Sequence, residues 1–118
     1  MSISREDFEA GRIDLSDVRG RGKPIGPIHP GEILQEEFLG PMKITAYRLA
    51  KDIRVPLNRI TAVLAGTRGI TADTAMRLGR YFGTSAGLWM NLQGRYDLET
   101  ARLELGAQIA NEVTPIAA

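Results

Sequence analysis

Residues 45–65, TAYRLAKDIRVPLNRITAVLA, decide the fold of this chain. Thr45 suits the N-cap of a helix because its hydroxyl can accept a hydrogen bond from a free backbone N–H, and the apolar periodicity carries that helix to residues 52–53. Pro56 suits the first turn of a second helix, which reaches Ala65. Two helices joined by about three residues are typical of a helix-turn-helix, whose second helix can enter the major groove of DNA.

The apolar residues of this stretch fit the packing that a helix-turn-helix requires. Two helices that cross at a steep angle need a small residue near the crossing, and Ala50 lies there. The positions expected to face inward are Leu49, Ile53, Val55, Ile60 and Val63. A plain helical hairpin is the alternative that these residues leave open.

Three more helices are predicted around this pair. Pro30 suits the first turn of one of them, and Gly40-Pro41 is expected to end it. Thr71 and Ser85 are candidate N-caps for the other two, and Gly83 is expected to end the first of these. Because no segment shows the alternation of a strand, we predict an all-α fold of five helices.

The chain is expected to form one domain with a flanking segment at each end, since 118 residues are short for two independent cores. Residues 1–28 contain glycine and proline without a sustained period, so we predict an N-terminal arm with at most a short helical turn over residues 6–10. Residues 29–106 are the predicted helix-turn-helix domain with a C-terminal dimerisation helix, and residues 107–118 are a tail.

Composition excludes most covalent and metal chemistry. The chain has no cysteine and one histidine, which leaves no disulfide, no thiol nucleophile and no multi-histidine metal site. We therefore expect no catalytic, metal-binding or cofactor-binding residues, with His29 in a capping or packing role and Glu36-Glu37 on a solvated face. No apolar run could span a bilayer and the N-terminus does not resemble a secretory signal, so the expected location is the cytoplasm, with no membrane partner.

The net charge of +1 conceals an uneven distribution along the chain. Residues 43–80 contain eight basic residues against two acidic ones, a local charge of +6. Residues 84–118 carry a local charge of −2, and residues 1–30 balance. Positive charge is thus concentrated on the predicted helix-turn-helix, where it can attract the phosphates of DNA, although solvated helix faces would give the same count.

The outward face of the second helix of the pair supplies candidate base-reading residues. Arginine can bind guanine through two hydrogen bonds, asparagine can bind adenine, and the methyl groups of threonine or alanine can contact thymine. The candidates are Leu57 at the margin, Asn58, Arg59, Thr61 and Ala62, with Asn58 and Arg59 ranked first. Residues near helix ends can hold phosphates without reading sequence, and these candidates are Lys43, Thr45, Arg48, Thr67 and Arg68.

Bulky apolar residues recur at helical spacing in the last predicted helix. Such a face belongs either to the core or to a subunit interface. We assign it to a homodimer interface formed by Leu88, Trp89, Leu92 and Tyr96.

Four segments together resemble HigA-type antitoxins of the repressor-like helix-turn-helix superfamily. They are residues 29–34 (HPGEIL), 49–51 (LAK), 66–75 (GTRGITADTA) and 89–93 (WMNLQ), and the resemblance covers about residues 28–105. It implies a homodimer that binds a palindromic operator in double-stranded DNA, represses its own operon and neutralises a HigB-type toxin, a small ribosome-dependent ribonuclease. The family usually has glycine where Arg54 stands, so the turn is either closed differently or holds Arg54 in the left-handed conformation.

Other functions are kept as alternatives. A stand-alone transcription regulator of the same fold would bind DNA without a toxin partner, and a protein-only adaptor would show no salt-dependent DNA binding. An enzyme finds no support, because the chain offers no convergent set of acid and base residues.

Overall fold

The structure is a computed structural model that describes residues 26–117. Its elements are α3 (Pro30–Ile33), η1 (Leu34–Leu39), α4 (Gly40–Met42), α5 (Ala46–Ile53), α6 (Leu57–Ala65), α7 (Ala72–Phe82) and α8 (Ala86–Glu112). Because α3, η1 and α4 follow one another without a break, the described residues form five helices and no strand, which confirms the predicted all-α fold. The predicted helical turn over residues 6–10, and the arm up to residue 25, lie outside the described residues.

The first helix is longer than predicted. His29 caps it, accepting a hydrogen bond from the Gly31 backbone N–H at 2.9 Å through Nδ1. The expectation that Gly40-Pro41 ends the helix is wrong, because the helix continues to Met42. The preceding η1 segment has the wider π-helical register, which loosens the backbone where a proline in a regular α-helix would clash.

The N-caps predicted for the later helices are confirmed. The hydroxyls of Thr45, Thr71 and Ser85 accept hydrogen bonds from backbone N–H groups of the first turns of α5, α7 and α8. Gly66 and Gly83 end α6 and α7 in the left-handed conformation, as expected for glycine. Local sequence signals therefore place these boundaries correctly.

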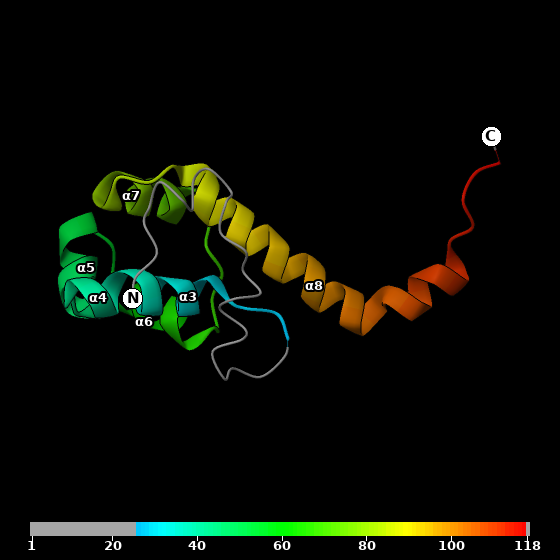
Figure 1. Cartoon of the computed structure of the whole chain (residues 1–118), viewed down its shortest axis with the longest axis horizontal. Helices are drawn as coiled ribbons and strands as arrows, with labels where there is room; N and C mark the ends of the chain where they lie inside the picture. Colours follow the sequence, from blue (N-terminus) through cyan, green and yellow to red (C-terminus); the bar gives the residue numbers. More distant parts are fainter. Residues whose placement is uncertain (1–25, 118) are drawn as a thin grey trace.

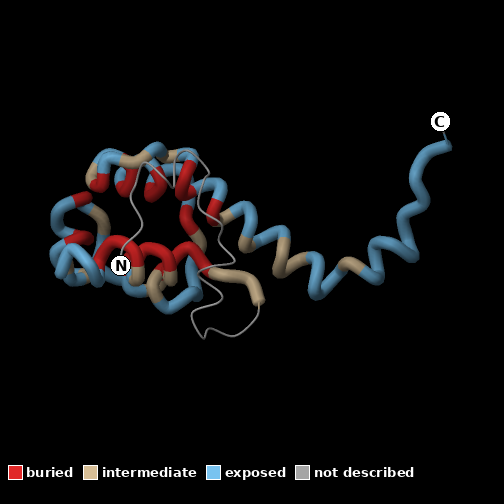
Figure 2. The backbone as a smooth tube through the Cα atoms, viewed as in Figure 1, coloured by how far each residue is buried: buried red, intermediate tan, exposed pale blue. Residues whose placement is uncertain are grey.

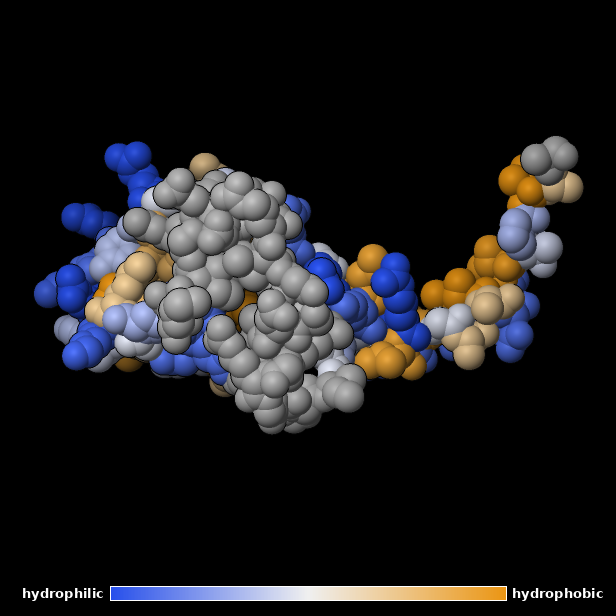
Figure 3. All heavy atoms as spheres, in the orientation of Figure 1, coloured by the Kyte–Doolittle hydropathy of each residue, from blue (hydrophilic) through white to orange (hydrophobic). Residues whose placement is uncertain are grey.

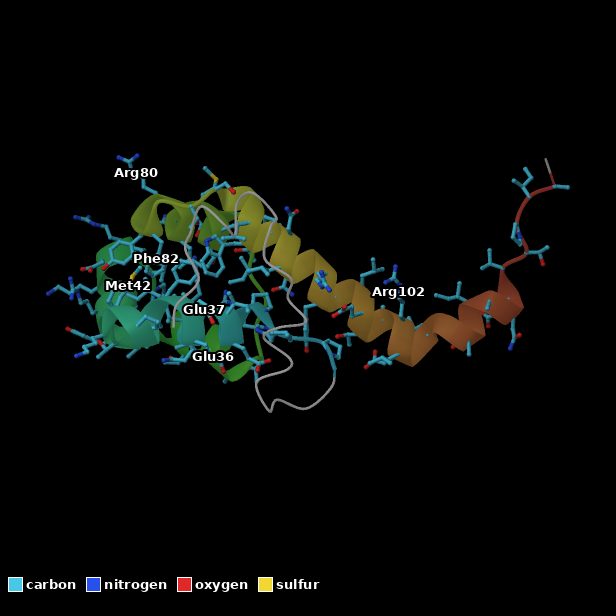
Figure 4. The ribbon with its side chains drawn as sticks, in the orientation of Figure 1. Glu36, Glu37, Met42, Arg80, Phe82 and Arg102 are labelled. Atoms are coloured by element: carbon cyan, nitrogen blue, oxygen red, sulfur yellow. The ribbon has the colours of Figure 1, made fainter. Side chains whose placement is uncertain are left out.

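The core lies between the first helix, the helix-turn-helix, α7 and the N-terminal part of α8 (Figure 2). Phe38, Phe82 and Trp89 form an aromatic cluster in this core. The ring centroid of Phe38 lies 4.9 Å from that of Phe82 and 5.1 Å from that of Trp89. Phe82 points into the interior of the fold (Figure 4). Glu37 is also buried, so the expectation of a solvated face is wrong for that residue.

The prediction of a dimer interface at Leu88, Trp89 and Leu92 is wrong, because these side chains belong to the core of the monomer. Trp89 is fully buried, and its indole N–H donates to the Thr84 hydroxyl at 3.0 Å. The helical spacing of these residues is confirmed, but periodicity alone does not distinguish a face covered by the same chain from one covered by a partner. Tyr96, the fourth residue of that set, packs edge-on against the ring of His29.

The distal part of α8 projects away from the other helices (Figure 1). Its buried residues lie near its start, whereas the later large apolar residues are exposed. The helix also continues past residue 106, to Glu112. None of the described helices is long and apolar enough to cross a membrane.

Candidate nucleic-acid interface

The turn between α5 and α6 is closed by Arg54 in the left-handed conformation, with φ 61° and ψ 51°. Arg54 N–H donates to the carbonyls of Ala50 and Lys51, and Val55 N–H donates to Ala50 O at 3.0 Å. This is the Schellman-type closure that glycine usually provides, so the second of the two possibilities considered for Arg54 is the observed one.

The helices on either side of this turn pack as predicted. Leu49, Ile60 and Val63 are essentially inaccessible to solvent, and Ala50 and Ile53 are also buried. Val55 packs against the same core from the turn. The prediction of a helix-turn-helix is confirmed by this packing and by the three residues that separate Ile53 from Leu57.

The position of α6 depends on close contact with the first helix. A Cβ atom on Gly31 would collide with the carbonyl oxygen of Val63. Only glycine allows α3 to approach the backbone of α6 this closely. The loop after α6 is held by Gln93, whose side-chain oxygen accepts from Ile70 N–H at 2.7 Å.

The base-reading candidates lie along one side of α6. Leu57, Asn58 and Thr61 are exposed, and Ala62 is half-buried. The Thr61 hydroxyl donates to Asn58 O at 3.3 Å, whereas the Asn58 side chain makes none of the hydrogen bonds seen within residues 26–117. These four residues therefore offer a ligand an amide, a hydroxyl, a large apolar side chain (Leu57) and a methyl group (Ala62).

Arg59 is less accessible than the sequence suggested. Its side chain is only 25% exposed, and its Nη1 donates to Asp73 Oδ2 on α7 at 2.6 Å. The same carboxylate accepts hydrogen bonds from Arg77 Nε at 3.1 and 3.2 Å. Arg59 thus sits at the edge of the reading face, tied to the next helix.

The phosphate-contact candidates lie at the ends of the two helices. Lys43 and Arg68 are exposed, and Arg48 pairs with Asp52 at 3.4 Å while its side chain stays 62% exposed. The hydroxyl of Thr45 is occupied by capping α5, and that of Thr67 donates to Ala62 O at 3.2 Å. The three cations are better suited to contact a ligand than the two hydroxyls.

The two acidic residues of the basic region are both bound to cations or hydroxyls. A hydrogen bond from the Tyr81 hydroxyl, at 2.5 Å, lowers the pKa of Asp52. Hydrogen bonds from Arg77, and to a smaller extent from Arg59, lower the pKa of Asp73.

Strongly hydrophilic side chains gather at the end of the molecule formed by α5 and the C-terminal part of α7 (Figure 3). Arg80 points outward there (Figure 4).

Sequence reasoning missed the roles of Gly31, Asp73 and Arg77. An acid and a base four residues apart on a helix are a recognisable pair, so Asp73 with Arg77 could have been proposed. The contact of Asp73 with Arg59 spans 14 residues and has no sequence signal. Within residues 26–117 no group of three or more histidine, cysteine, aspartate or glutamate residues could hold a metal ion.

No family model matches the chain, but individual proteins do. Virulence-associated protein I of Dichelobacter nodosus is 51% identical over 89 residues, which cover 75% of this chain and 81% of that protein.

Solved structures match the fold as well. The Pseudomonas aeruginosa antitoxin HigA, solved with the higBA promoter, has a TM-score of 0.76 and 48% identity, covering 77% of this chain and 99% of that one. An addiction module antidote protein of a HigA family from Coxiella burnetii has a TM-score of 0.75 and 51% identity, covering 78% and 100%.

Proposed function

The chain belongs to the HigA family of antitoxins, and on this premise we propose that it binds operator DNA through α6, represses its own operon and neutralises a HigB-type ribonuclease toxin. The single observation that carries the DNA-binding part is the exposed side of α6, which belongs to the stretch of residues 43–80 with a local charge of +6. Binding to its own operon also implies that the protein acts in the cytoplasm, where that DNA lies.

The residues of α6 suit direct readout of bases. Asn58, Thr61 and Leu57 project from a helix that is fixed from behind by the core, and such a helix can lie in the major groove. Lys43 and Arg48, at the start of α5, and Arg68, after the end of α6, are exposed cations that can contact phosphates. We propose that the first group, with Arg59 and Ala62, selects the sequence, and that the second group, with Thr45 and Thr67, positions the protein.

The promoter complex of the Pseudomonas aeruginosa relative supports this assignment, because its chain has nearly the same fold over almost its full length. We propose residues 29–106 as the DNA-binding unit and residues 1–28 as an arm. The tail proposed from residue 107 begins only after α8 ends at Glu112. The toxin-binding part of the proposal rests on family membership.

A homodimer is proposed as the DNA-binding form, through the distal part of α8. Leu98, Leu105 and Ile109 are exposed, and their spacing of seven and four residues places them on one side of a helix. Hydrophobic side chains are visible along this projecting part in Figure 3. Two copies joined here would carry two α6 helices, and recognition helices in successive major grooves lie roughly 34 Å apart and require an imperfect palindrome.

A gel shift with the DNA upstream of its own gene tests the proposal, performed with and without the product of the neighbouring gene. We expect the upstream DNA to shift at lower protein concentration than scrambled DNA of equal composition. We also expect the chain to form a complex with the neighbouring gene's product, a small basic protein, whose ribonuclease activity is lost in the complex. Specific DNA binding without such a partner would favour a stand-alone regulator. Absence of salt-dependent DNA binding would contradict the proposal as a whole.

A further inference from the structure

Asp73, near the start of α7, links α7 to the helix-turn-helix. Its carboxylate accepts from Arg59 Nη1 on α6 at 2.6 Å and from Arg77 Nε at 3.1 and 3.2 Å. Arg77 in turn donates through Nη1 to the carbonyl of Ile53, the last residue of α5, at 2.8 Å. The Asp73 carboxylate therefore binds α6 directly and is connected to α5 through Arg77.

These contacts restrict the guanidinium of Arg59. Its Nη1 is held by Asp73, and its Nε is buried without a hydrogen-bond partner within residues 26–117. Nη2 and the second N–H of Nη1 remain for a ligand, and a bidentate contact to guanine uses two donors on one edge. A side chain that is already ordered also loses less rotamer entropy when it binds.

Building on the proposed DNA-binding function, we infer that Asp73 is a positioning residue for sequence specificity, which holds Arg59 in the orientation that reads a base. A fixed guanidinium presents its donors in one direction and can distinguish bases, whereas a mobile one can reach a phosphate on any sequence. Removal of the Asp73 carboxylate therefore converts Arg59 from a selective contact into a general one.

A purely structural role for Asp73 would have different consequences. Its side chain is 53% exposed, and ion pairs this exposed contribute little to folding stability. A structural role, acting through Arg77 and the end of α5, would weaken binding to all DNA sequences alike. The ratio of affinities for operator and scrambled DNA separates the two roles.

The test measures Kd by fluorescence anisotropy at several salt concentrations, with a duplex from upstream of the gene and a scrambled duplex. Asp73→Asn keeps the side-chain shape and is expected to lower the ratio of operator affinity to scrambled-DNA affinity at least about threefold. Most of this change should come from tighter binding to scrambled DNA, and that binding should depend more steeply on salt than in the wild-type protein. Arg59→Ala is expected to lower the ratio by about 5- to 150-fold. In the Arg59→Ala background, Asp73→Asn should change the ratio by less than about twofold.

Asp52→Asn is the matched control, because it removes one carboxylate from the neighbouring helix α5, where Asp52 binds Arg48 and Tyr81. It should change both affinities by the same factor. Thermal unfolding by circular dichroism checks that each variant folds. If Asp73→Asn does not fold, Asp73→Glu keeps the charge but moves the carboxylate by one methylene, and it should lower the ratio in the same direction.

Three results would overturn the inference and leave the DNA-binding function intact. The first is an unchanged affinity ratio in the Asp73→Asn variant. The second is a fall of the ratio in Asp52→Asn as large as that in Asp73→Asn. The third is a further fall of the ratio when Asp73→Asn is added to Arg59→Ala. If the wild-type protein does not distinguish the two duplexes, the proposed function fails and this inference fails with it.

Discussion

Arg54 ends α5 in a conformation that costs a residue with a side chain about 1 kcal/mol relative to glycine. We predict that Arg54→Gly raises the free energy of unfolding by roughly 0.5–1 kcal/mol, with part of the gain lost to the greater freedom of glycine in the unfolded chain. Arg54→Ala is the control, because it removes the same side chain without relieving the backbone. Urea unfolding measures both, and equal stability of the two variants would contradict the explanation.

We expect His29 to make the free energy of unfolding depend on pH. Burial lowers its pKa from the ordinary value of 6.5, although the charges of Glu32 and Asp97 and a hydrogen bond to the Arg68 backbone oppose this. A proton on Nδ1 would also remove the acceptor that caps the helix. Because the unfolded chain binds the proton more readily, the stabilisation is complete above pH 6.5 and is lost as the pH falls through 6.5 toward the folded pKa.

We therefore predict a lower free energy of unfolding at pH 5 than at pH 7.5. The fall should be smaller in His29→Asn, which can cap the helix but does not titrate. The lowered pKa values of Asp52 and Asp73 affect stability only at lower pH, below about 4, so the window between pH 5 and 7.5 reports His29. An identical pH dependence in the variant would rule out His29 as the cause.

Between elements, the contact of α3 with α6 depends on the absence of a side chain at Gly31. We predict that Gly31→Ala lowers the free energy of unfolding by about 3 kcal/mol, near the upper end for overpacking, because the added methyl must displace the backbone of α6 at Val63. The same substitution at Gly94, where a Cβ has open space, should be neutral or stabilising because alanine favours helix.

Thermal unfolding measures both variants, and the operator affinity of Gly31→Ala reports whether α6 has moved. Equal stability of the Gly31→Ala and Gly94→Ala proteins would show that the close approach is not required.

At the scale of the whole molecule, the exposed residues of distal α8 predict self-association. Leu105→Lys should convert a dimer into a monomer and weaken operator binding, because it places a charge in the proposed apolar interface. Leu103→Lys is the control, since Leu103 is 76% exposed and lies on another side of the helix. Sedimentation equilibrium measures the mass, and dissociation by both variants, or by neither, would exclude this interface.

The sequence by itself determined the number of helices, the N-caps of α5, α7 and α8 and the inward residues of the helix-turn-helix, but not where the first and last helices end. Thr45, Gly66, Thr71 and Ser85 act within a few residues of themselves, so their roles can be read locally. The four segments that resemble HigA antitoxins were likewise sufficient to identify the family.

Only the tertiary structure decided which faces are covered and which cations are held. Trp89 and its neighbours on α8 have the spacing of an interface but are buried within one chain. This side of α8 packs against Phe38 of η1 and Phe82 of α7. The tie between Arg59 and Asp73 likewise depends on how α6 and α7 meet in space. Contacts between distant segments have no local signature, so packing alone sets the orientation of this arginine on the proposed reading helix.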